Sequence, residues 1–284
     1  MKTTTTLDEL HAALKKLPTP VGLVATMGFL HEGHLSLARR AGDENESVVA
    51  TIFVNPTQFG PGEDLDAYPR NMMGDLAKLE SEGVDLVWHP AKEDVYPAGF
   101  QTTVTVSQLS RRLEGEHRPG HFEGVATVVA KLFNIVRPDR AYFGQKDAQQ
   151  AAVIKRMVRD LNFPVEIVIC PTVRESDGLA MSSRNNYLSD IQRAAAPVLY
   201  RALSVARSAY EDGQRDGKAL RELMLETLAE ETLADPQYVS CADPQTLEEL
   251  HKVEDDMLLS MAVVVGKTRL IDNFLLEGGE WVGE

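Results

Sequence analysis

The chain has 284 residues, of which 43% are hydrophobic and 25% are charged, and its formal net charge at pH 7 is −14. A chain of this length is longer than a single small domain, so we predict two domains of ordinary size. The acidic balance argues against a nucleic-acid-binding protein, because phosphate contacts need a basic surface. No apolar stretch is long enough to span a bilayer and the first residues form no hydrophobic signal region, so we expect a cytoplasmic protein without membrane partners.

The cysteines and histidines indicate no metal site. Cys170 and Cys241 are far apart in the sequence and have no partners at metal-binding spacing. Neither a disulfide framework nor a zinc pattern is present in the sequence, so we expect no metal site built from side chains. Both thiols are expected to be ordinary buried small residues.

The first part of the chain alternates apolar runs with helical patterns. Its apolar runs are continuous, which indicates strands that are buried on both faces of a parallel sheet covered by helices. The expected strands cover residues 21–25, 47–54, 84–89, 102–106, 140–143 and 165–170. Helices are expected over residues 7–17, from residue 33 onward, over 71–82, over 124–136 and from residue 144 onward. This order predicts a Rossmann-like α/β domain.

The pattern changes after Leu188. Helices are expected over residues 189–210 and 218–231, and strands over 237–242, 261–265 and 268–271. We therefore predict a Rossmann-like domain over residues 1–175. A smaller C-terminal α+β domain over residues 176–284 is expected to act as a lid over a nucleotide.

A glycine turn with two histidines, residues 25–34 (ATMGFLHEGH), follows the first buried strand. A strand that ends at Gly28 and a helix that begins near Gly33 bring backbone N–H groups and a positive dipole end together, which suits phosphate. Glycine at both positions allows a tight turn and a close ligand. His31 and His34, three residues apart, can both donate to one anion. Two surface histidines that cap a turn are the plainer alternative.

Asn55 and Gln58 follow the second strand at the same edge of the sheet, where open α/β sheets bind ligands. Their amides donate and accept hydrogen bonds, which fits a hydroxylated, carboxylated small molecule better than a phosphate. A plain Asn-Pro turn is an equal alternative. The glycine-rich loop over residues 60–66 is expected to be mobile. The polar segment over residues 111–122 is either a source of cations for a phosphate tail or a solvated loop.

Another strand ends at Gly144 and a helix follows it. There Lys146 can neutralise a phosphate, Asp147 can accept from a ribose hydroxyl, and Gln150, one helical turn beyond Lys146, can face an acyl substrate.

Ser182, Ser183 and Arg184 form a compact set that suits a phosphate, because two hydroxyls can donate and a guanidinium can bind two oxygens at once. A helix-capping loop is the alternative for this segment.

Four separated fragments resemble, in order and spacing, the family of pantoate–β-alanine ligases. They are residues 26–34 (TMGFLHEGH), 53–59 (FVNPTQF), 143–150 (FGQKDAQQ) and 181–185 (MSSRN). The first fragment also resembles the H-x-G-H signature of the nucleotidyltransferase superfamily, which class I aminoacyl-tRNA synthetases share. The similarity covers nearly the whole chain and includes residues 118–122 and 269–273.

The resemblance implies an enzyme that condenses pantoate with β-alanine at the expense of ATP. Pantoate attacks ATP to give pantoyl adenylate and pyrophosphate, and β-alanine then displaces AMP to form the C–N bond of pantothenate. Mg²⁺ accompanies ATP, and the family forms homodimers through its N-terminal domain. The partners implied are therefore three small-molecule substrates and a second copy of the chain.

The resemblance also implies roles for individual residues. His34 is the proton donor, with His31 beside it on the phosphates. Gln58 and Gln150 bind pantoate, with Gln58 also next to β-alanine. Asn55, from its own amide chemistry, is expected in the same substrate-binding set. The catalytic set is His31, His34, Lys146, Ser182, Ser183 and Arg184, the last three of which replace the K-M-S-K-S loop of the synthetases. The ATP-binding set is Met27, Gly28, Phe29, Leu30, His31, Glu32, Gly33, His34, Gly144, Gln145, Lys146, Asp147, Val173, Met181, Ser182, Ser183 and Arg184.

Two positions depart from the family pattern. Ala25 stands where proline is common and is expected to affect only the rigidity of the turn. Gln145 stands where glutamate is frequent, so one negative charge beside Lys146 is missing.

Two other functions stay open from the sequence. Another H-x-G-H nucleotidyltransferase would need more cations for its acceptor than Asn55, Gln58 and Gln150 offer. A catalytically silent nucleotide-binding or scaffold protein fits poorly with the intact histidine, lysine and Ser-Ser-Arg groups. The acidic charge disfavours a tRNA synthetase.

Overall fold

The computed structural model describes residues 1–283, and these form two compact units. The first unit contains residues 1–111, 118–144 and 153–170. The second contains residues 112–117, 145–152 and the chain from residue 171 onward. Two short segments from the middle of the chain are thus part of the C-terminal unit.

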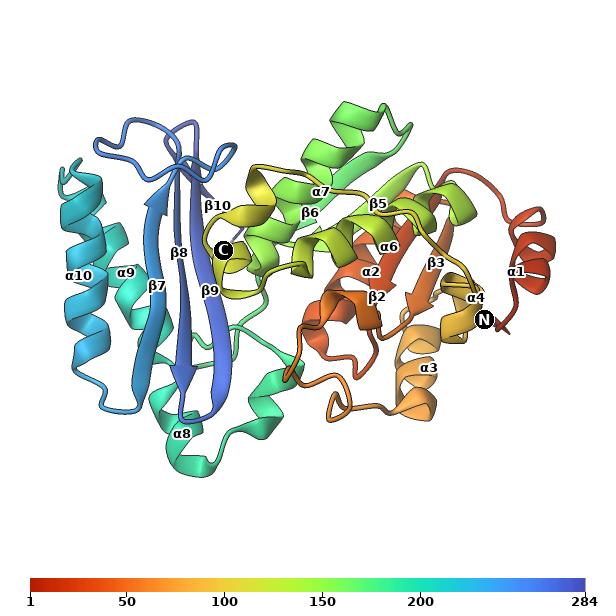
Figure 1. The fold of residues 1–284 in the computed structure, drawn as a ribbon, viewed down its shortest axis with the longest axis horizontal. Coiled ribbons are helices and arrows are strands. Elements are labelled where there is room, and N and C mark those ends of the chain that lie inside the picture. The colour runs from red at the N-terminus through yellow and green to blue at the C-terminus, as the bar shows by residue number, and fades with distance from the viewer. Residues whose placement is uncertain (284) are drawn as a thin grey trace. The chain divides into compact units, whose positions relative to one another are not determined.

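The first unit is built on a six-stranded sheet with the strand order β1-β4-β3-β2-β5-β6, in which every neighbouring pair runs parallel (Figure 1). The strands are β1 (Lys2–Thr4), β2 (Val21–Thr26), β3 (Ser47–Ile52), β4 (Leu86–Trp88), β5 (Arg140–Gly144) and β6 (Glu166–Cys170). Because β2 and β3 pair in parallel with α2 (Glu32–Glu44) between them in the chain, the expected β-α-β unit is confirmed.

Helices cover this sheet, as the continuous apolar strands predict. Val24 of β2 and Ala50 of β3 belong to one hydrophobic cluster with Leu37 of α2 and with Leu79 of α3 (Met72–Ser81). Side chains alternate along a strand, so Leu23 points to the opposite face, where it is only 1% exposed. The other helices and 3₁₀ turns of this unit are α1 (Leu7–Leu14), η1 (Pro56–Gln58), α3 (Met72–Ser81), α4 (Lys92–Val95), η2 (Leu109–Arg111), α6 (His121–Val136) and the later part of α7 (Ala148–Leu161).

The expected strand over residues 102–106 is wrong. This segment is irregular, and the N–H of Val104 donates to Oγ1 of Thr127 over 2.9 Å instead of to a neighbouring strand. The β-branched residues of the segment favour a strand, but in the described part of the chain it pairs with no strand of the six-stranded sheet. The three residues of β1 are too few to show a pattern in the sequence.

The second unit contains an antiparallel sheet with the strand order β10-β9-β8-β7. The strands are β7 (Ala234–Ala242), β8 (Met257–Val265), β9 (Thr268–Glu277) and β10 (Glu280–Val282). The helices and 3₁₀ turns are α5 (Glu114–His117), η3 (Gln145–Asp147), the start of α7, η4 (Ser183–Tyr187), α8 (Asp190–Ala195), α9 (Val198–Glu211) and α10 (Gly217–Ala229). The predicted fold class, a parallel α/β domain with a smaller C-terminal α+β domain, is confirmed.

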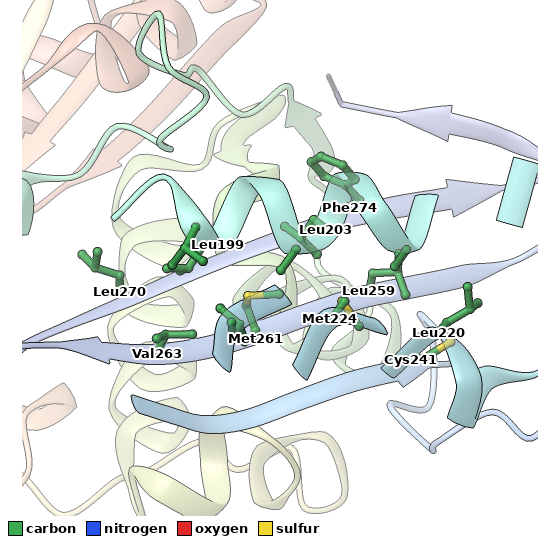
Figure 2. Close-up of a cluster of buried hydrophobic side chains, with 14 of the residues drawn as sticks. Leu199, Leu203, Leu220, Met224, Cys241, Leu259, Met261, Val263, Leu270 and Phe274 are labelled. Atoms are coloured by element: carbon green, nitrogen blue, oxygen red, sulfur yellow. The ribbon is translucent and has the colours of Figure 1, made fainter. Parts of the chain in front are cut away.

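The core of the second unit lies between one face of its sheet and two helices. Figure 2 shows this cluster, whose labelled side chains come from α9, α10 and strands β7 to β9. Its labelled members are Leu199, Leu203, Leu220, Met224, Cys241, Leu259, Met261, Val263, Leu270 and Phe274. Alternate strand residues, such as Ser260 and Asn273, point to the opposite face of the sheet. Among residues 1–283, no helix has both the length and the apolar character needed to cross a membrane.

Candidate functional site

The histidine turn is held from behind by a buried carboxylate on α3. Asp75 is 2% exposed, and its Oδ2 and Oδ1 accept the backbone N–H groups of Phe29 and Leu30 over 2.7 and 2.8 Å. Gly28 has a φ of +83°, and a Cβ added there would lie 3.0 Å from both Asp75 Oδ2 and Ile52 Cγ2. Glycine is therefore required at this position by conformation and by space.

Lys78, one turn after Asp75 on α3, binds the same turn. Its Nζ donates to the carbonyl oxygen of Leu30 over 2.6 Å. Neither Asp75 nor Lys78 is among the residues predicted from the sequence. The signal that points to Asp75 is its spacing: it lies four residues before the buried Leu79, so α3 carries a carboxylate on its apolar face.

The two histidines lie side by side at the start of α2. His31 is the N-cap residue with extended backbone, and its N–H donates to Nδ1 of His34 over 3.3 Å. The two ring centroids are 4.1 Å apart. In a neutral ring, an accepting Nδ1 leaves the proton on Nε2, so His34 presents a donor on its far side. Gly33 leaves room for this pair, because its Cβ would lie 3.0 Å from the His31 ring.

Asn55 is buried and its amide is satisfied within the protein. The side chain is 1% exposed; its Nδ2 donates to the carbonyl of Gly124 and to Oε1 of Gln58 over 3.1 and 3.0 Å. Its Oδ1 accepts from the hydroxyls of Tyr96 and Thr57 over 2.8 and 2.9 Å. A backbone carbonyl can only accept, so Gly124 determines which way the Asn55 amide faces.

This orientation in turn determines the polarity of Gln58. Because Nδ2 of Asn55 can only donate, the oxygen of the Gln58 amide must face it. The Nε2 group of Gln58 then lies on the other side, where it is 3.1 Å from the sulfur of Met27. The structure thus joins Met27 of the histidine turn to Gln58, and Gln58 offers a donor to a ligand. Burial raises the pKa of Tyr96, which keeps its hydroxyl protonated for Asn55.

The start of α6 supports η1, the 3₁₀ turn that carries Gln58. A Cβ on Gly124 would overlap the carbonyl oxygen of Thr57, so α6 and η1 touch backbone to backbone. Nδ1 of His121 donates to the carbonyl of Gln58 over 2.7 Å. Arg118 binds both oxygens of Glu63 over 2.8 and 2.7 Å. Arg118 and His121, at the end of the polar segment, therefore hold η1 and the loop over residues 60–66.

The charge pair in this cluster is largely buried, with 13% of the Arg118 side chain and 24% of the Glu63 side chain exposed. Burial alone would raise the pKa of Glu63, but the hydrogen bonds and charge of Arg118 act in the opposite direction. Together with smaller contributions, they hold this pKa below its ordinary value of 4.5. Glu63 is therefore charged at neutral pH.

In the second unit, Lys146 and Asp147 lie on η3, directly after the end of β5. Nζ of Lys146 is 3.9 Å from Oδ1 of Asp147, and 21% of the lysine side chain is exposed. Gln145 is 5% exposed, and its Nε2 donates to Oδ1 of Asn273 over 2.9 Å. Gln150 lies partly exposed in the first turn of α7, one helical turn beyond Lys146.

The Ser-Ser-Arg segment begins where a short bridge between Arg174 and Ala180 ends. The N–H of Met181 donates to the carbonyl of Val173 over 2.9 Å, which brings two predicted ATP-binding residues together. Ser182 is the N-cap of η4, and its Oγ accepts the N–H of Arg184 over 3.2 Å. Capping was the alternative to phosphate binding for this segment; a hydroxyl that accepts can still donate its own proton.

Glu32 and Ser183 complete the predicted set. Glu32 faces Arg39 on α2, whose Nη1 donates to its Oε1 over 3.0 Å. Ser183 is 6% exposed at the start of η4. Among residues 1–283, no three histidine, cysteine, aspartate or glutamate side chains converge to hold a metal ion.

Comparison with known proteins identifies the family. The family model described as pantoate-beta-alanine ligase matches residues 1–275. A pantothenate synthetase of Herpetosiphon aurantiacus is 59% identical over 277 residues, which are 97% of this chain and 100% of the relative. The crystal structure of pantothenate synthetase from Thermus thermophilus is 49% identical, with a TM-score of 0.92 over 96% of this chain and 98% of the other.

A second solved structure carries ligands. It is the pantoate-beta-alanine ligase from Francisella tularensis complexed with beta-gamma ATP and beta-alanine, 35% identical, with a TM-score of 0.80 over 97% of each chain. The resemblance seen in the four sequence fragments is thereby confirmed. With a model match over residues 1–275 and relatives that share more than half of its sequence, the chain belongs to the pantoate–β-alanine ligase family.

Proposed function

We propose that this protein joins (R)-pantoate to β-alanine with ATP, through a pantoyl-adenylate intermediate, and releases AMP and pyrophosphate. The observation that carries this proposal is the histidine turn, whose backbone is held by Asp75 in a chain of this ligase family. Donors at a helix N-terminus suit a triphosphate.

In the first step, a pantoate carboxylate oxygen forms a bond to the α-phosphorus of ATP, and the bond from that phosphorus to pyrophosphate breaks. This reaction needs no protein nucleophile. Catalysis comes from alignment of the reactants and from donors placed where charge develops. We assign these donors to His34 through Nε2, to His31 beside it, to Lys146, and to the Ser182, Ser183 and Arg184 group.

In the second step, the β-alanine amine attacks the acyl carbon of the adenylate. The amide C–N bond forms, the bond from the acyl carbon to the AMP oxygen breaks, and the amine loses its proton to solvent. Gln58 and Gln150 are proposed to bind pantoate, with Gln58 also next to β-alanine. Asn55 contributes to this substrate site through Gln58, because the amide of Asn55 is already filled by protein groups.

ATP is proposed to bind as its magnesium complex. The predicted nucleotide segments supply histidine, lysine, hydroxyl and guanidinium groups, which suit phosphate oxygens better than a divalent cation. Their two carboxylates, Glu32 and Asp147, lie beside Arg39 and Lys146. Mg²⁺ prefers oxygen ligands, including water and substrate phosphates. The ATP-binding segments proposed are residues 27–34, residues 144–147, Val173 and residues 181–184.

We further propose that the protein forms a homodimer through its N-terminal part and is located in the cytosol. Residues 1–175 are proposed to bind ATP and pantoate. Residues 176–284, together with the loop over residues 60–66, are proposed to exclude water from the adenylate. Trapping by hydroxylamine tests this exclusion, since a sheltered adenylate gives little hydroxamate. Light scattering tests the dimer.

The decisive experiment is ATP–pyrophosphate exchange. We expect exchange that requires pantoate and does not require β-alanine. A nucleotidyltransferase with a phosphorylated acceptor would show no pantoate-dependent exchange, and a silent scaffold would release no AMP in a single turnover. Either result would overturn the proposed function.

A further inference from the structure

Two neighbouring residues in the middle of β9, Asp272 and Asn273, are polar and only 2% and 4% exposed. Buried polar groups lower stability unless they are hydrogen-bonded. Neighbouring residues of a strand point to opposite faces of a sheet. This pair can therefore hold one chain segment on each face.

Asn273 binds the main chain that carries Lys146. Its Nδ2 donates to the carbonyl oxygens of Gln145 and Lys146 over 3.0 and 2.9 Å, and its Oδ1 accepts from Nε2 of Gln145. Two backbone carbonyls can only accept, so the orientation of the Asn273 amide is unambiguous. Because the carbonyl of Lys146 itself is bound, a shift of Asn273 moves the residue that carries the lysine ammonium group.

Asp272 binds the segment that leads to Ser182. Its Oδ2 and Oδ1 accept from Nη1 and Nη2 of Arg174 over 2.7 and 3.0 Å, a two-pronged ion pair. The guanidinium also lies over the rings of Tyr200 and Phe274, at 4.9 and 5.2 Å from their centroids. Only 14% of the Arg174 side chain is exposed.

Arg174 also binds the turn over residues 174–180, which precedes Ser182 and Ser183. Its Nη1 donates to the carbonyl of Gly178 over 3.0 Å, and its backbone bridges to Ala180. The next residues of this turn, Met181 and Ser182, begin the Ser-Ser-Arg segment. The two halves of the β9 pair are also joined, since the N–H of Asn273 donates to Oδ1 of Asp272 over 2.8 Å.

We propose that Asp272 and Asn273 are positioning residues that keep Lys146 and the Ser182–Arg184 segment in one fixed register for the nucleotide. The inference rests on the proposed function for the identity of the ligand. The physical reason is that catalysis by charge placement is sensitive to small displacements: a shift of about 1 Å costs about 10²-fold in rate. Because Asp272 and Asn273 are neighbours on one strand, they limit the displacement of both Lys146 and the Ser182–Arg184 segment.

The test compares Asn273→Ala with the matched control Ser260→Ala. Ser260 lies directly opposite Asn273 on β8, points to the same face and is 6% exposed. Its Oγ has no hydrogen-bond partner among residues 1–283, so its removal breaks no bond. For Asn273→Ala we expect a rise in KM for ATP and a fall of about 10²-fold in kcat of pantoate-dependent exchange. KM for pantoate stays unchanged, and Ser260→Ala keeps all three parameters.

Two further variants keep the proposal testable if Asn273→Ala does not fold. Asn273→Asp preserves volume but places a carboxylate oxygen against the carbonyls of Gln145 and Lys146, so the same selective loss for ATP is expected. Asp272→Asn removes the charge that pairs with Arg174. It is expected to weaken the binding of ATP and to leave the binding of pantoate unchanged. Circular dichroism and the melting temperature establish that each variant is folded.

A folded variant of either residue with unchanged kcat and unchanged KM for ATP would overturn the inference. An equal effect on ATP and pantoate would also overturn it, because that is the result of general loosening. Calorimetric titration with a non-hydrolysable ATP analogue separates this failure from failure of the proposed function. If the parent protein shows no pantoate-dependent exchange, the function fails, whereas weaker binding of the analogue by Asn273→Ala alone still supports the positioning role.

Discussion

Nδ2 of Asn55 donates to Oε1 of Gln58 over 3.0 Å, so the amide of a buried residue decides which end of the neighbouring amide points away from it. In this arrangement Gln58 presents N–H groups, which suit a carboxylate or hydroxyl oxygen. The relationship can be inverted by a change of one atom in Asn55.

Asn55→Asp performs this inversion. The new carboxylate can only accept, so the Gln58 amide is expected to rotate and turn its oxygen toward pantoate. A lost hydrogen bond to a charged group costs about 1.5–3 kcal/mol, so KM for pantoate should rise about 10–100-fold. Exchange kinetics at varied pantoate measure the effect. Tyr96→Phe removes only one donor to Asn55 and leaves the Gly124 contact, so its effect should be smaller; equal kinetics for all three proteins would contradict the assignment.

Asp75→Ala should disorder the histidine turn. The N–H groups of Phe29 and Leu30 lose their acceptor, and the expected loss is about 2–4 kcal/mol in the free energy of unfolding, with a rise in KM for ATP. Urea denaturation and exchange kinetics measure the two effects. Asp139→Ala is the control, because Asp139 accepts a backbone N–H from Val21 at the other end of β2. The control should lose stability and keep its KM for ATP.

His34→Ala and Lys146→Ala should each lower kcat about 10²–10³-fold, the usual effect of losing one preorganised donor. Single-turnover formation of AMP is the measurement, with folding checked by circular dichroism. His11→Ala, at an exposed position on α1, is the control and should behave as the parent protein. Near-normal turnover in either site variant would remove that residue from the catalytic set.

The Arg118–Glu63 pair should make the loop over residues 60–66 sensitive to acid. Burial raises the pKa of Glu63, but Arg118 outweighs this effect, so the pKa in the folded protein lies below 4.5. A lowered pKa means that the contribution of the pair to stability is present above the ordinary value and is lost as the pH falls through the folded one. The protection factor of the loop amides, which is the ratio of the intrinsic to the observed exchange rate at the same pH, should therefore fall in acid. In Glu63→Gln this protection factor should be lower already at neutral pH and should change less in acid.

Both thiols should be unreactive in the native protein. Burial raises the pKa of Cys241 from 9.0 to about 12 and raises that of Cys170 as well. The reactive thiolate is therefore scarce at mildly alkaline pH. We expect iodoacetamide to modify neither residue in the native protein and both in urea, as measured by mass spectrometry. The contribution of Cys241 to the free energy of unfolding is complete below its ordinary pKa and is lost as the pH rises toward 12. In Cys241→Ala the free energy of unfolding should therefore decrease less steeply with rising pH in this range.

The fold and the site were predictable from the sequence to different extents. β2, α2 and β3 were predictable because local signals agree there: continuous apolar runs, a glycine turn and a helix of amphipathic spacing. The strand expected over residues 102–106 was wrong because β-branched composition reports a preference and not a partner.

The supporting residues were not predictable in the same way. Asp75 binds N–H groups more than forty positions earlier in the chain, and Asn273 binds carbonyls more than a hundred positions earlier. Such contacts depend on the assembled fold and leave little trace in local spacing. The sequence identifies Asn55 as a polar residue at the ligand-binding edge of the predicted sheet, but only the structure shows that protein groups occupy the hydrogen-bonding positions of its amide.

Gly124 has a mechanical consequence. Its lack of a side chain lets a helix of 16 residues rest directly on the peptide of Thr57 and Gln58. A displacement of the Gln58 backbone is therefore opposed by the whole helix α6, which is stiffer than a loop. If pantoate binds Gln58 as proposed, its binding should be transmitted along the whole length of α6.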